Sequence, residues 1–255
     1  MTQKAYAKVN VFLKILGTRG NYHELSSRFV QVNSLYDTLT FSHKEKENAH
    51  FALEGDFGCP LEKNTIYKAY LLLKKEVPKI ENFFKTHKLT VDKKIPEFAG
   101  LGGGSSDAAT FLRLTNQTLS LGLSPEALAS IGAKIGADVP FFVYNYTTAN
   151  VSGIGEIVKP FEEEALNIQT FTPKIACDTA KVYTAFREGF LKDINIKKAK
   201  TLEDIPSQTL LQNEDAIFLN DLFAPALSLY PKLRDYHDNN FFSGSGSTFF
   251  RSLDG

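Results

Sequence analysis

A glycine-rich segment with two serines is the part of this sequence that points most directly to chemistry. It reads Gly100-Leu101-Gly102-Gly103-Gly104-Ser105-Ser106 and precedes an apolar stretch with helical spacing. Glycines let backbone N–H groups crowd around an anion, and a helix N-terminus adds partial positive charge. The serine hydroxyls can donate to phosphate oxygens. The segment therefore predicts a phosphate site, and the loop alone leaves open the alternative of a flexible loop or a tight helix entry.

Two well-known phosphate-binding patterns are excluded for this segment. A P-loop requires a glycine followed by lysine, and no glycine in the chain is followed by lysine. The dinucleotide pattern requires a further glycine five positions after the first, but Ser105 stands there when counting from Gly100, and Asp107 when counting from Gly102. Residues 93–98 are also too short and polar for a buried parallel strand. If the loop binds phosphate, it therefore does so through neither of these two patterns.

Three further polar residues are candidates for catalysis. Lys8 and Asn10 are two residues apart in an alternating segment, so their side chains project from the same face of a strand. Asp138 lies in a turn between an expected helix and an expected strand. Taken alone, Lys8 and Asn10 fit a solvent-facing strand, and Asp138 fits an ordinary turn. The local sequence leaves both interpretations open.

The elements that position these residues follow from hydrophobic spacing. Alternation predicts a strand over 7–16, followed by a turn at 17–21 and a second β-like run over 28–35. Helical spacing is found over 64–77 and from residue 108, and Ser124-Pro125 starts a helix that stops at Gly136. We further expect a polar loop at 42–50, strands at 89–95, 138–144 and 168–177, helices at 180–190 and 209–237, an irregular segment at 192–208, and a strand–turn–strand at 241–250.

The composition fits a globular protein of one large domain or two small lobes. The chain has 255 residues, and Lys plus Arg equals Asp plus Glu at 29 each, so no net field favours nucleic acid or an anionic membrane. Cys59 and Cys177 are too few for a disulfide framework or a structural zinc site. No run of 18 apolar residues occurs. We expect a cytoplasmic protein, a monomer or weak homodimer, without nucleic-acid or membrane partners.

Several motifs, in their order along the chain, resemble the GHMP kinases (galactokinase, homoserine kinase, mevalonate kinase and phosphomevalonate kinase). Ile95-Pro96 followed by residues 100–109 resembles the phosphate-binding motif of that superfamily. Residues 7–13, 22–25 and 136–142 are similar to segments of the members that phosphorylate 4-diphosphocytidyl-2-C-methyl-D-erythritol. Residues 242–247 resemble the third superfamily motif. Together these segments span most of the chain.

The resemblance implies an α+β, two-lobed GHMP-kinase fold. It implies an N-terminal ATP-binding lobe over 1–150, with a ribosomal-protein-S5-domain-2-like fold. It also implies a smaller C-terminal lobe over 151–255, a ferredoxin-like α/β-plait that completes the substrate cleft.

The resemblance also assigns roles to individual residues. Lys8 and Asp138 become the catalytic pair, with Asp138 as the base that accepts the hydroxyl proton and Lys8 beside it. The ATP-binding residues are Gly100 to Ser106 together with Asn64, Lys93 and Asp107, and Ser106 is the candidate magnesium ligand. Tyr22 and Tyr183 would stack on the cytosine of the substrate, and His23 would hydrogen-bond to it. The full set of implied substrate-binding residues is Asn10, Tyr22, His23, Asp138, Thr179, Tyr183 and Gly244.

The implied reaction is transfer of the ATP γ-phosphate to the 2-hydroxyl of 4-diphosphocytidyl-2-C-methyl-D-erythritol, a step of the non-mevalonate (methylerythritol phosphate) isoprenoid pathway, with ATP and Mg²⁺ as cofactors. The alternatives are another GHMP kinase, of the mevalonate or homoserine type, and a non-catalytic nucleotide sensor. Tyr22, His23 and Tyr183 argue against the first, because those acceptors carry no base to stack. Lys8 and Asp138 argue against the second, because a sensor needs no base.

Asp107 departs from the family pattern, which more often has asparagine after the two serines. A carboxylate close to a polyphosphate repels it. We therefore expect a magnesium ion or a lysine near Asp107 to offset its charge.

Overall fold

The structure is a computed structural model that describes residues 1–20, 22–48 and 50–254, and it divides into two compact units. Unit 1 comprises Met1–Ala7, Leu35–Glu97 and Gly103–Asn145, and unit 2 comprises Lys8–Ser34, Phe98–Gly102 and Tyr146–Gly255. Both units are discontinuous because the long strands β1 (Thr2–Arg19) and β2 (Tyr22–His43) each contribute to both. The predicted lobes, 1–150 and 151–255, are continuous segments, and their boundary stays a prediction.

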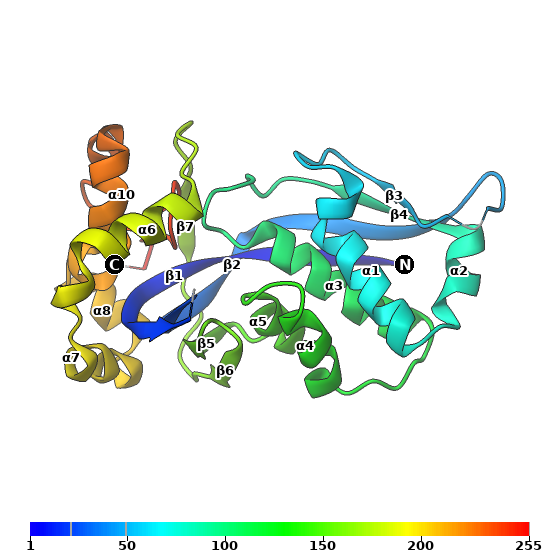
Figure 1. The fold of residues 1–255 in the computed structure, drawn as a ribbon, viewed down its shortest axis with the longest axis horizontal. Helices are drawn as coiled ribbons and strands as arrows, with labels where there is room; N and C mark the ends of the chain where they lie inside the picture. Colours follow the sequence, from blue (N-terminus) through cyan, green and yellow to red (C-terminus); the bar gives the residue numbers. More distant parts are fainter. Residues whose placement is uncertain (21, 49, 255) are drawn as a thin grey trace. The chain divides into compact units, whose positions relative to one another are not determined.

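Unit 1 combines strands with a group of helices (Figure 1). The later part of β2 pairs antiparallel with β4 (His87–Asp92), which pairs in parallel with the short β3 (Ala52–Glu54). Helices α1, α3, α4 and α5 pack against one another in the same unit. The helices and the 3₁₀ turn of unit 1 are η1 (Leu61–Lys63), α1 (Thr65–Glu76), α2 (Ile80–Thr86), α3 (Gly103–Thr118), α4 (Pro125–Ala133) and α5 (Val139–Tyr144).

Aromatic side chains fill the core of unit 1 between its strands and helices. The rings of Phe51 and Tyr70 are stacked at 4.2 Å. The ring of Phe51 also lies 5.0 Å from that of Phe84 and 5.7 Å from that of Phe111. Phe41, from β2, meets Phe84 edge-on at 5.6 Å. All five side chains are buried. Aromatic residues bury large apolar areas, so this cluster ties the sheet to α1, α2 and α3.

Two helices of unit 1 begin where the sequence predicts. The side chain of Asn64 accepts a hydrogen bond from the backbone N–H of Ile66 at the start of α1, and that of Ser124 accepts one from Ala127 at the start of α4. Pro125 occupies the first turn of α4, where its missing N–H costs nothing. Helix α3 begins at Gly103, earlier than the predicted 108, so half of the glycine-rich segment is helical.

The strand predicted over 138–144 is wrong, because this segment is the helix α5. Residues 139–143 are all buried, and a short apolar run fits a buried strand and a buried helix equally well. Pro140 lies in the first turn of α5, and the helix ends at Asn145 in a left-handed conformation with φ 57°. Proline in the first turn and asparagine after the last are typical helix boundaries.

Unit 2 contains two groups of strands. In the first group, the earlier part of β2 pairs antiparallel with β5 (Thr148–Gly153), and β5 pairs antiparallel with β6 (Ile157–Pro160). The second group is an antiparallel sheet with the strand order β7 (Ile168–Phe171), β9 (Phe249–Ser252) and β8 (Phe241–Phe242). The remaining elements are α6 (Thr179–Gly189), η2 (Leu191–Asp193), α7 (Ile196–Thr201), η3 (Leu202–Asp204), α8 (Ser207–Asn213), α9 (Ala216–Leu219), α10 (Phe223–Leu229) and η4 (Pro231–Tyr236). Helices α6 and α10 pack together.

A buried arginine joins several segments of unit 2. The Arg28 guanidinium donates to Asn150 Oδ1 at 2.6 Å and to the Glu203 carbonyl at 2.7 Å, and it lies 3.4 Å from the Phe161 ring centroid. Its side chain is fully buried. Because every arginine N–H needs an acceptor once it is removed from water, this residue fixes the segment around η3 against β2 and β5.

The remaining sequence predictions have mixed outcomes. The strand–turn–strand near 241–250 and the helix near 180–190 are confirmed. The irregular segment predicted over 192–208 is wrong in part, because Asn195 caps the short helix α7 by accepting from the Lys198 N–H. The predicted turn at 17–21 is shorter, since β1 continues to Arg19, and Asn21 lies outside the described residues.

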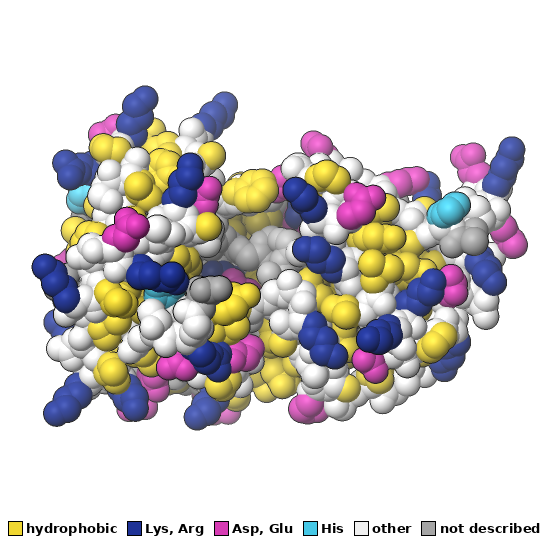
Figure 2. Space-filling model, in the orientation of Figure 1, with side chains coloured by type: hydrophobic (Ala, Val, Ile, Leu, Met, Phe, Trp, Pro, Cys, Tyr) yellow, Lys and Arg dark blue, Asp and Glu magenta, His cyan; other side chains and the backbone are white. Residues whose placement is uncertain are grey.

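Charges are mixed over the surface. Figure 2 shows Lys and Arg side chains interspersed with Asp and Glu over the drawn face of unit 1. Within the described residues, no helix is long and apolar enough to cross a membrane.

Candidate active site

The N-terminus of α3 supplies the phosphate-binding geometry within unit 1. A side chain at Gly103 would place its Cβ 2.9 Å from Ile95 Cγ2, so only glycine permits this approach. The hydroxyl of Thr65 donates to the Gly104 carbonyl at 2.6 Å and thereby links the starts of α1 and α3. Ser105 is half-buried and Ser106 is buried. The unpaired backbone N–H groups of this first turn suit an anion.

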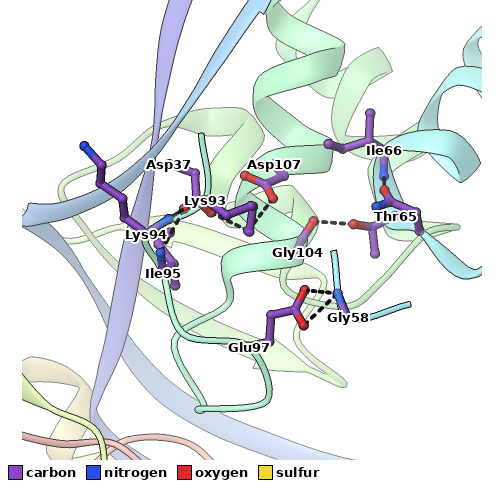
Figure 3. Close-up of polar contacts among 11 residues, drawn as sticks. Asp37, Gly58, Thr65, Ile66, Lys93, Lys94, Ile95, Glu97, Gly104 and Asp107 are labelled. Atoms are coloured by element: carbon purple, nitrogen blue, oxygen red, sulfur yellow. Dashed lines mark hydrogen bonds and ion pairs between the residues drawn. The ribbon is translucent and has the colours of Figure 1, made fainter. Parts of the chain in front are cut away.

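Lys93 lies between two carboxylates beside the start of α3 (Figure 3). Its ammonium is 2.5 Å from Asp37 Oδ2 and 2.7 Å from Asp107 Oδ2. The other oxygen of Asp37 accepts the backbone N–H groups of Lys94 and Ile95, at 2.5 and 2.8 Å. Asp37 therefore fixes the segment that leads to the loop, and Lys93 joins that segment to α3. We call Asp37, Lys93 and Asp107 the charge cluster.

The charge cluster places two carboxyl groups and one ammonium group in a buried position. Burial raises the pKa of Asp107 to about 7, and the nearby Lys93 opposes this effect without cancelling it. Burial alone would lower the pKa of Lys93, but Asp107 and Asp37 outweigh it and the pKa of Lys93 is raised. Asp107 Oδ1 is buried and has no hydrogen-bond partner among the described residues. The cation expected near Asp107 is thus a lysine of the chain itself.

Asp138 immediately precedes α5 in the same unit. It is half-buried and has helical dihedrals, φ −80° and ψ −13°. The turn before it passes close to α3, because a Cβ added at Gly136 would lie 3.7 Å from Ser105 Oγ. The Asp138 segment and the phosphate-binding turn are therefore neighbours within unit 1.

Lys8 and Asn10 form a buried polar pair in unit 2, not a solvent-facing strand face. Lys8 Nζ donates to Asn10 Oδ1 at 2.6 Å and lies 4.4 Å from the Phe29 ring centroid. Both side chains are almost fully buried. A buried lysine needs compensating partners, and Asn10 is one of them, so the two residues form a polar pair inside unit 2 and not on its surface.

The first residues of the glycine-rich segment belong to unit 2 and contact the C-terminal motif there. The Leu101 carbonyl accepts the backbone N–H of Lys8 at 3.0 Å, and the Gly100 carbonyl accepts the Ser243 hydroxyl at 3.0 Å. A Cβ at Gly244 would lie 3.5 Å from Asn10 Oδ1. Gly100, Leu101, Gly244 and Asn10 therefore lie close together within unit 2.

Two predicted substrate-binding residues, His23 and Tyr183, form an aromatic pair elsewhere in unit 2. The rings of His23 and Tyr183 are 5.0 Å apart and tilted by 32°, and His23 is buried. Among the described residues, His23 Nε2 has no hydrogen-bond partner. Burial and, secondarily, the charge of Arg187 lower the pKa of His23, which favours the neutral ring. Tyr22 is exposed.

Other residues assigned from the sequence have clear local partners. Thr179 Oγ1 lies 2.8 Å from Ser245 Oγ, which places the start of α6 beside the C-terminal motif. Asn64 is buried and its side-chain oxygen is used as the cap of α1. The described residues contain no group of three His, Cys, Asp or Glu side chains that could hold a metal ion.

Three residues at these sites were not predicted from the sequence: Asp37, Thr65 and Ser27. Asp37 lies in β2 among many other polar residues, such as Asn33 and Thr38, so the sequence carries no signal that singles it out. Thr65 follows the Asn64 cap and looks like an ordinary first-turn residue. Ser27 hydrogen-bonds to Asn10 at 2.9 Å, a contact between residues far apart in the sequence.

The comparisons with known proteins agree with this fold. Residues 64–146 match the family described as "GHMP kinases N terminal domain". A solved 4-(cytidine 5'-diphospho)-2C-methyl-D-erythritol kinase superposes with a TM-score of 0.77 at 30% identity, covering 100% of this chain and 91% of that one. The mevalonate kinase of Methanococcus jannaschii, at 13% identity and a TM-score of 0.63, shares the fold. The α+β fold and its glycine-rich helix start are those of a GHMP kinase.

Curated relatives show which family of GHMP kinases the chain belongs to. The 4-diphosphocytidyl-2-C-methyl-D-erythritol kinase of Sulfurimonas denitrificans is 52% identical over 254 residues, covering 97% of this chain and 95% of the relative. The corresponding kinase of Helicobacter pylori is 40% identical over 262 residues with the same coverage. The chain belongs to the 4-diphosphocytidyl-2-C-methyl-D-erythritol kinase family.

Proposed function

We propose that this chain transfers the γ-phosphate of ATP to the 2-hydroxyl of 4-diphosphocytidyl-2-C-methyl-D-erythritol, in the methylerythritol phosphate route to isoprenoids. The family supports the reaction, and one observation supports this acceptor. His23 presents a buried imidazole next to the ring of Tyr183, and its Nε2 has no hydrogen-bond partner among the described residues. A buried nitrogen without a partner is costly unless a ligand satisfies it, and cytosine offers both a hydrogen-bonding edge and a face to stack.

The ATP side of the proposal uses the glycine-rich segment. The backbone N–H groups of the segment from Gly100 to Ser106 bind phosphate oxygens, and Gly103 to Ser106 form the start of α3. Asn64 and Lys93 belong to the adenine or ribose end. Lys93 also offsets the charge of Asp107, which would otherwise repel the polyphosphate.

Asp138 and Lys8 carry the chemistry in this proposal. An alcohol is a far weaker acid than a carboxylic acid, so Asp138 accepts the proton late, as the new bond to phosphorus forms. The Lys8 ammonium stabilises the negative charge that develops on the acceptor oxygen. The proton goes from the acceptor hydroxyl to Asp138, and ADP leaves with the electron pair of the broken bond.

Magnesium enters this proposal bound to the ATP phosphates. It would neutralise phosphate charge, with the Ser106 hydroxyl in the first turn of α3 as its protein ligand. A hydroxyl oxygen suits this hard cation, and magnesium commonly keeps most of its ligands from phosphate and water.

The proposal also covers the roles of the two lobes, the cellular compartment and the oligomeric state. The lobes are 1–150 for ATP and 151–255 for completing the substrate cleft. The protein acts in the cytoplasm as a monomer or weak homodimer on two small molecules. Free thiols at Cys59 and Cys177 suit a reducing compartment.

Measuring ATP consumption by the purified protein tests this function. The cytidyl substrate, mevalonate and homoserine are offered separately, and we expect turnover only with the first. Turnover only with an acceptor that lacks a base would overturn the specific assignment. ATP binding without turnover on any acceptor would overturn the enzyme assignment in favour of a nucleotide sensor.

A further inference from the structure

A line of hydrogen bonds connects Lys8 to the backbone of β1 in unit 2. Lys8 Nζ is 2.6 Å from Asn10 Oδ1, Asn10 Nδ2 is 2.9 Å from Ser27 Oγ, and Ser27 Oγ is 2.5 Å from the Phe12 carbonyl. Lys8, Asn10 and Ser27 are each no more than 3% exposed. Bulk water therefore does not compete for these contacts.

The direction of every hydrogen bond in this line is determined by its two ends. An ammonium group can only donate, and a backbone carbonyl can only accept. Ser27 has one proton, and it must go to the Phe12 carbonyl, so its oxygen is left to accept from the Asn10 amide nitrogen. The Asn10 oxygen then necessarily faces Lys8. The ambiguity between the amide oxygen and nitrogen is thus resolved by chemistry.

Strand geometry explains why Ser27 can do this. Lys8 and Asn10 are two apart on β1, and Ser27 and Phe29 are two apart on β2, so each pair shares one face of its strand. Phe29 lies 4.4 Å from the ammonium while Ser27 holds the amide. Together they fix Lys8 from two directions.

We propose that Ser27 is a positioning residue for Lys8, acting through the side-chain amide of Asn10. Without the Ser27 hydroxyl, Asn10 Nδ2 loses its acceptor, so the amide is no longer held in one orientation and its oxygen no longer fixes the ammonium. Lys8 would then leave the position in which it meets the developing charge. This inference rests on the catalytic role of Lys8 proposed above.

The test compares two neighbouring buried serines. Ser27→Ala is expected to lower kcat roughly 10- to 100-fold, because a misplaced catalytic group loses transition-state stabilisation, while KM for ATP stays within about twofold. Ser26→Ala is the matched control: its hydroxyl donates to Glu203 Oε1 at 2.7 Å, away from Asn10, and kcat should stay within about twofold. Ser27→Cys keeps the side-chain shape but replaces the oxygen with a larger sulfur that is a weak acceptor, and kcat should fall here too.

A double-variant measurement separates positioning from structural damage. If Ser27 acts through Asn10, Asn10→Ala and Asn10→Ala with Ser27→Ala should have the same kcat. A further fall caused by Ser27→Ala in the Asn10→Ala background would overturn the proposal. So would full kcat in Ser27→Ala or Ser27→Cys while Lys8→Met is inactive. If Lys8→Met itself keeps full kcat, the catalytic role of Lys8 fails instead, and the positioning role fails with it.

Discussion

Lys93 Nζ lies 2.7 Å from Asp107 Oδ2, and this ion pair links the segment before the glycine-rich loop to the first turns of α3. The same ammonium is 2.5 Å from Asp37 Oδ2. The ammonium of Lys93 is therefore paired with two buried carboxyl groups next to the start of α3, where phosphate is proposed to bind. The arrangement makes Asp107 compatible with ATP and gives the loop a measurable dependence on pH.

The first prediction concerns Asp107→Asn. The pKa of Asp107 is raised from the ordinary 3.8 to about 7. Between these values the folded protein keeps a proton that the unfolded chain has lost, so the stability of the wild type falls as pH rises through this window. Lys93, whose pKa is raised, stays charged throughout. Urea unfolding should show the variant gaining stability relative to wild type between about pH 4 and 7, and little change above pH 7. A pH-independent difference would contradict this.

Lys93→Met should destabilise the protein strongly. It leaves Asp37 and Asp107 as buried carboxylates without a cation, at a cost of roughly 3–5 kcal/mol in unfolding free energy. The control is Lys94→Met, because Lys94 pairs with Asp92 at 3.2 Å on the surface, and its loss should cost about 1 kcal/mol or less. Adding Asp107→Asn to Lys93→Met should restore part of the stability. Equal losses for the two lysine variants would disprove the importance of the charge cluster.

Much of this fold could be predicted from local sequence signals. Asn64 and Ser124 mark the beginnings of α1 and α4 correctly, because a cap acts on residues two or three positions away. The segment 139–143 is predicted as part of a strand but is helical, because a fully buried run has no polar face that would show its period.

The candidate site likewise contains residues that the sequence motifs predict and residues that only the structure reveals. The resemblance supplied Lys8, Asn10, Asp138 and His23. It did not supply Asp37 or Ser27, whose contacts reach Lys93 and Asn10 across 56 and 17 positions of the sequence. Contacts of this kind depend on strand register, which a single sequence does not display.

Asp138→Asn should abolish most turnover and leave binding intact. An amide cannot accept the proton, so kcat should fall roughly 10²- to 10⁴-fold, while the affinities for ATP and acceptor measured by calorimetry stay nearly unchanged. Asp92→Asn, at an exposed carboxylate of the same unit, should keep full kcat. Retention of full kcat in Asp138→Asn would remove this residue from the base role.

Tyr183→Ala should weaken acceptor binding selectively. Loss of one stacked base partner should raise the KM for the cytidyl substrate roughly 5- to 150-fold and leave the KM for ATP unchanged. Phe171→Ala, at an exposed aromatic of the same unit, is the control and should change neither. An equal rise in both KM values would show that Tyr183 supports the fold and does not stack on cytosine.

Phosphorus NMR of the product tests the central claim most directly. In the cytidyl substrate the second carbon of the erythritol carries a methyl group and a hydroxyl but no hydrogen. Incubation with ATP and the wild-type protein should therefore give ADP and one new phosphomonoester signal without coupling to a proton on the carbon that bears it. A phosphomonoester signal split by such a proton would place the phosphate on another hydroxyl, and the absence of any new signal while ATP is bound would contradict the kinase assignment.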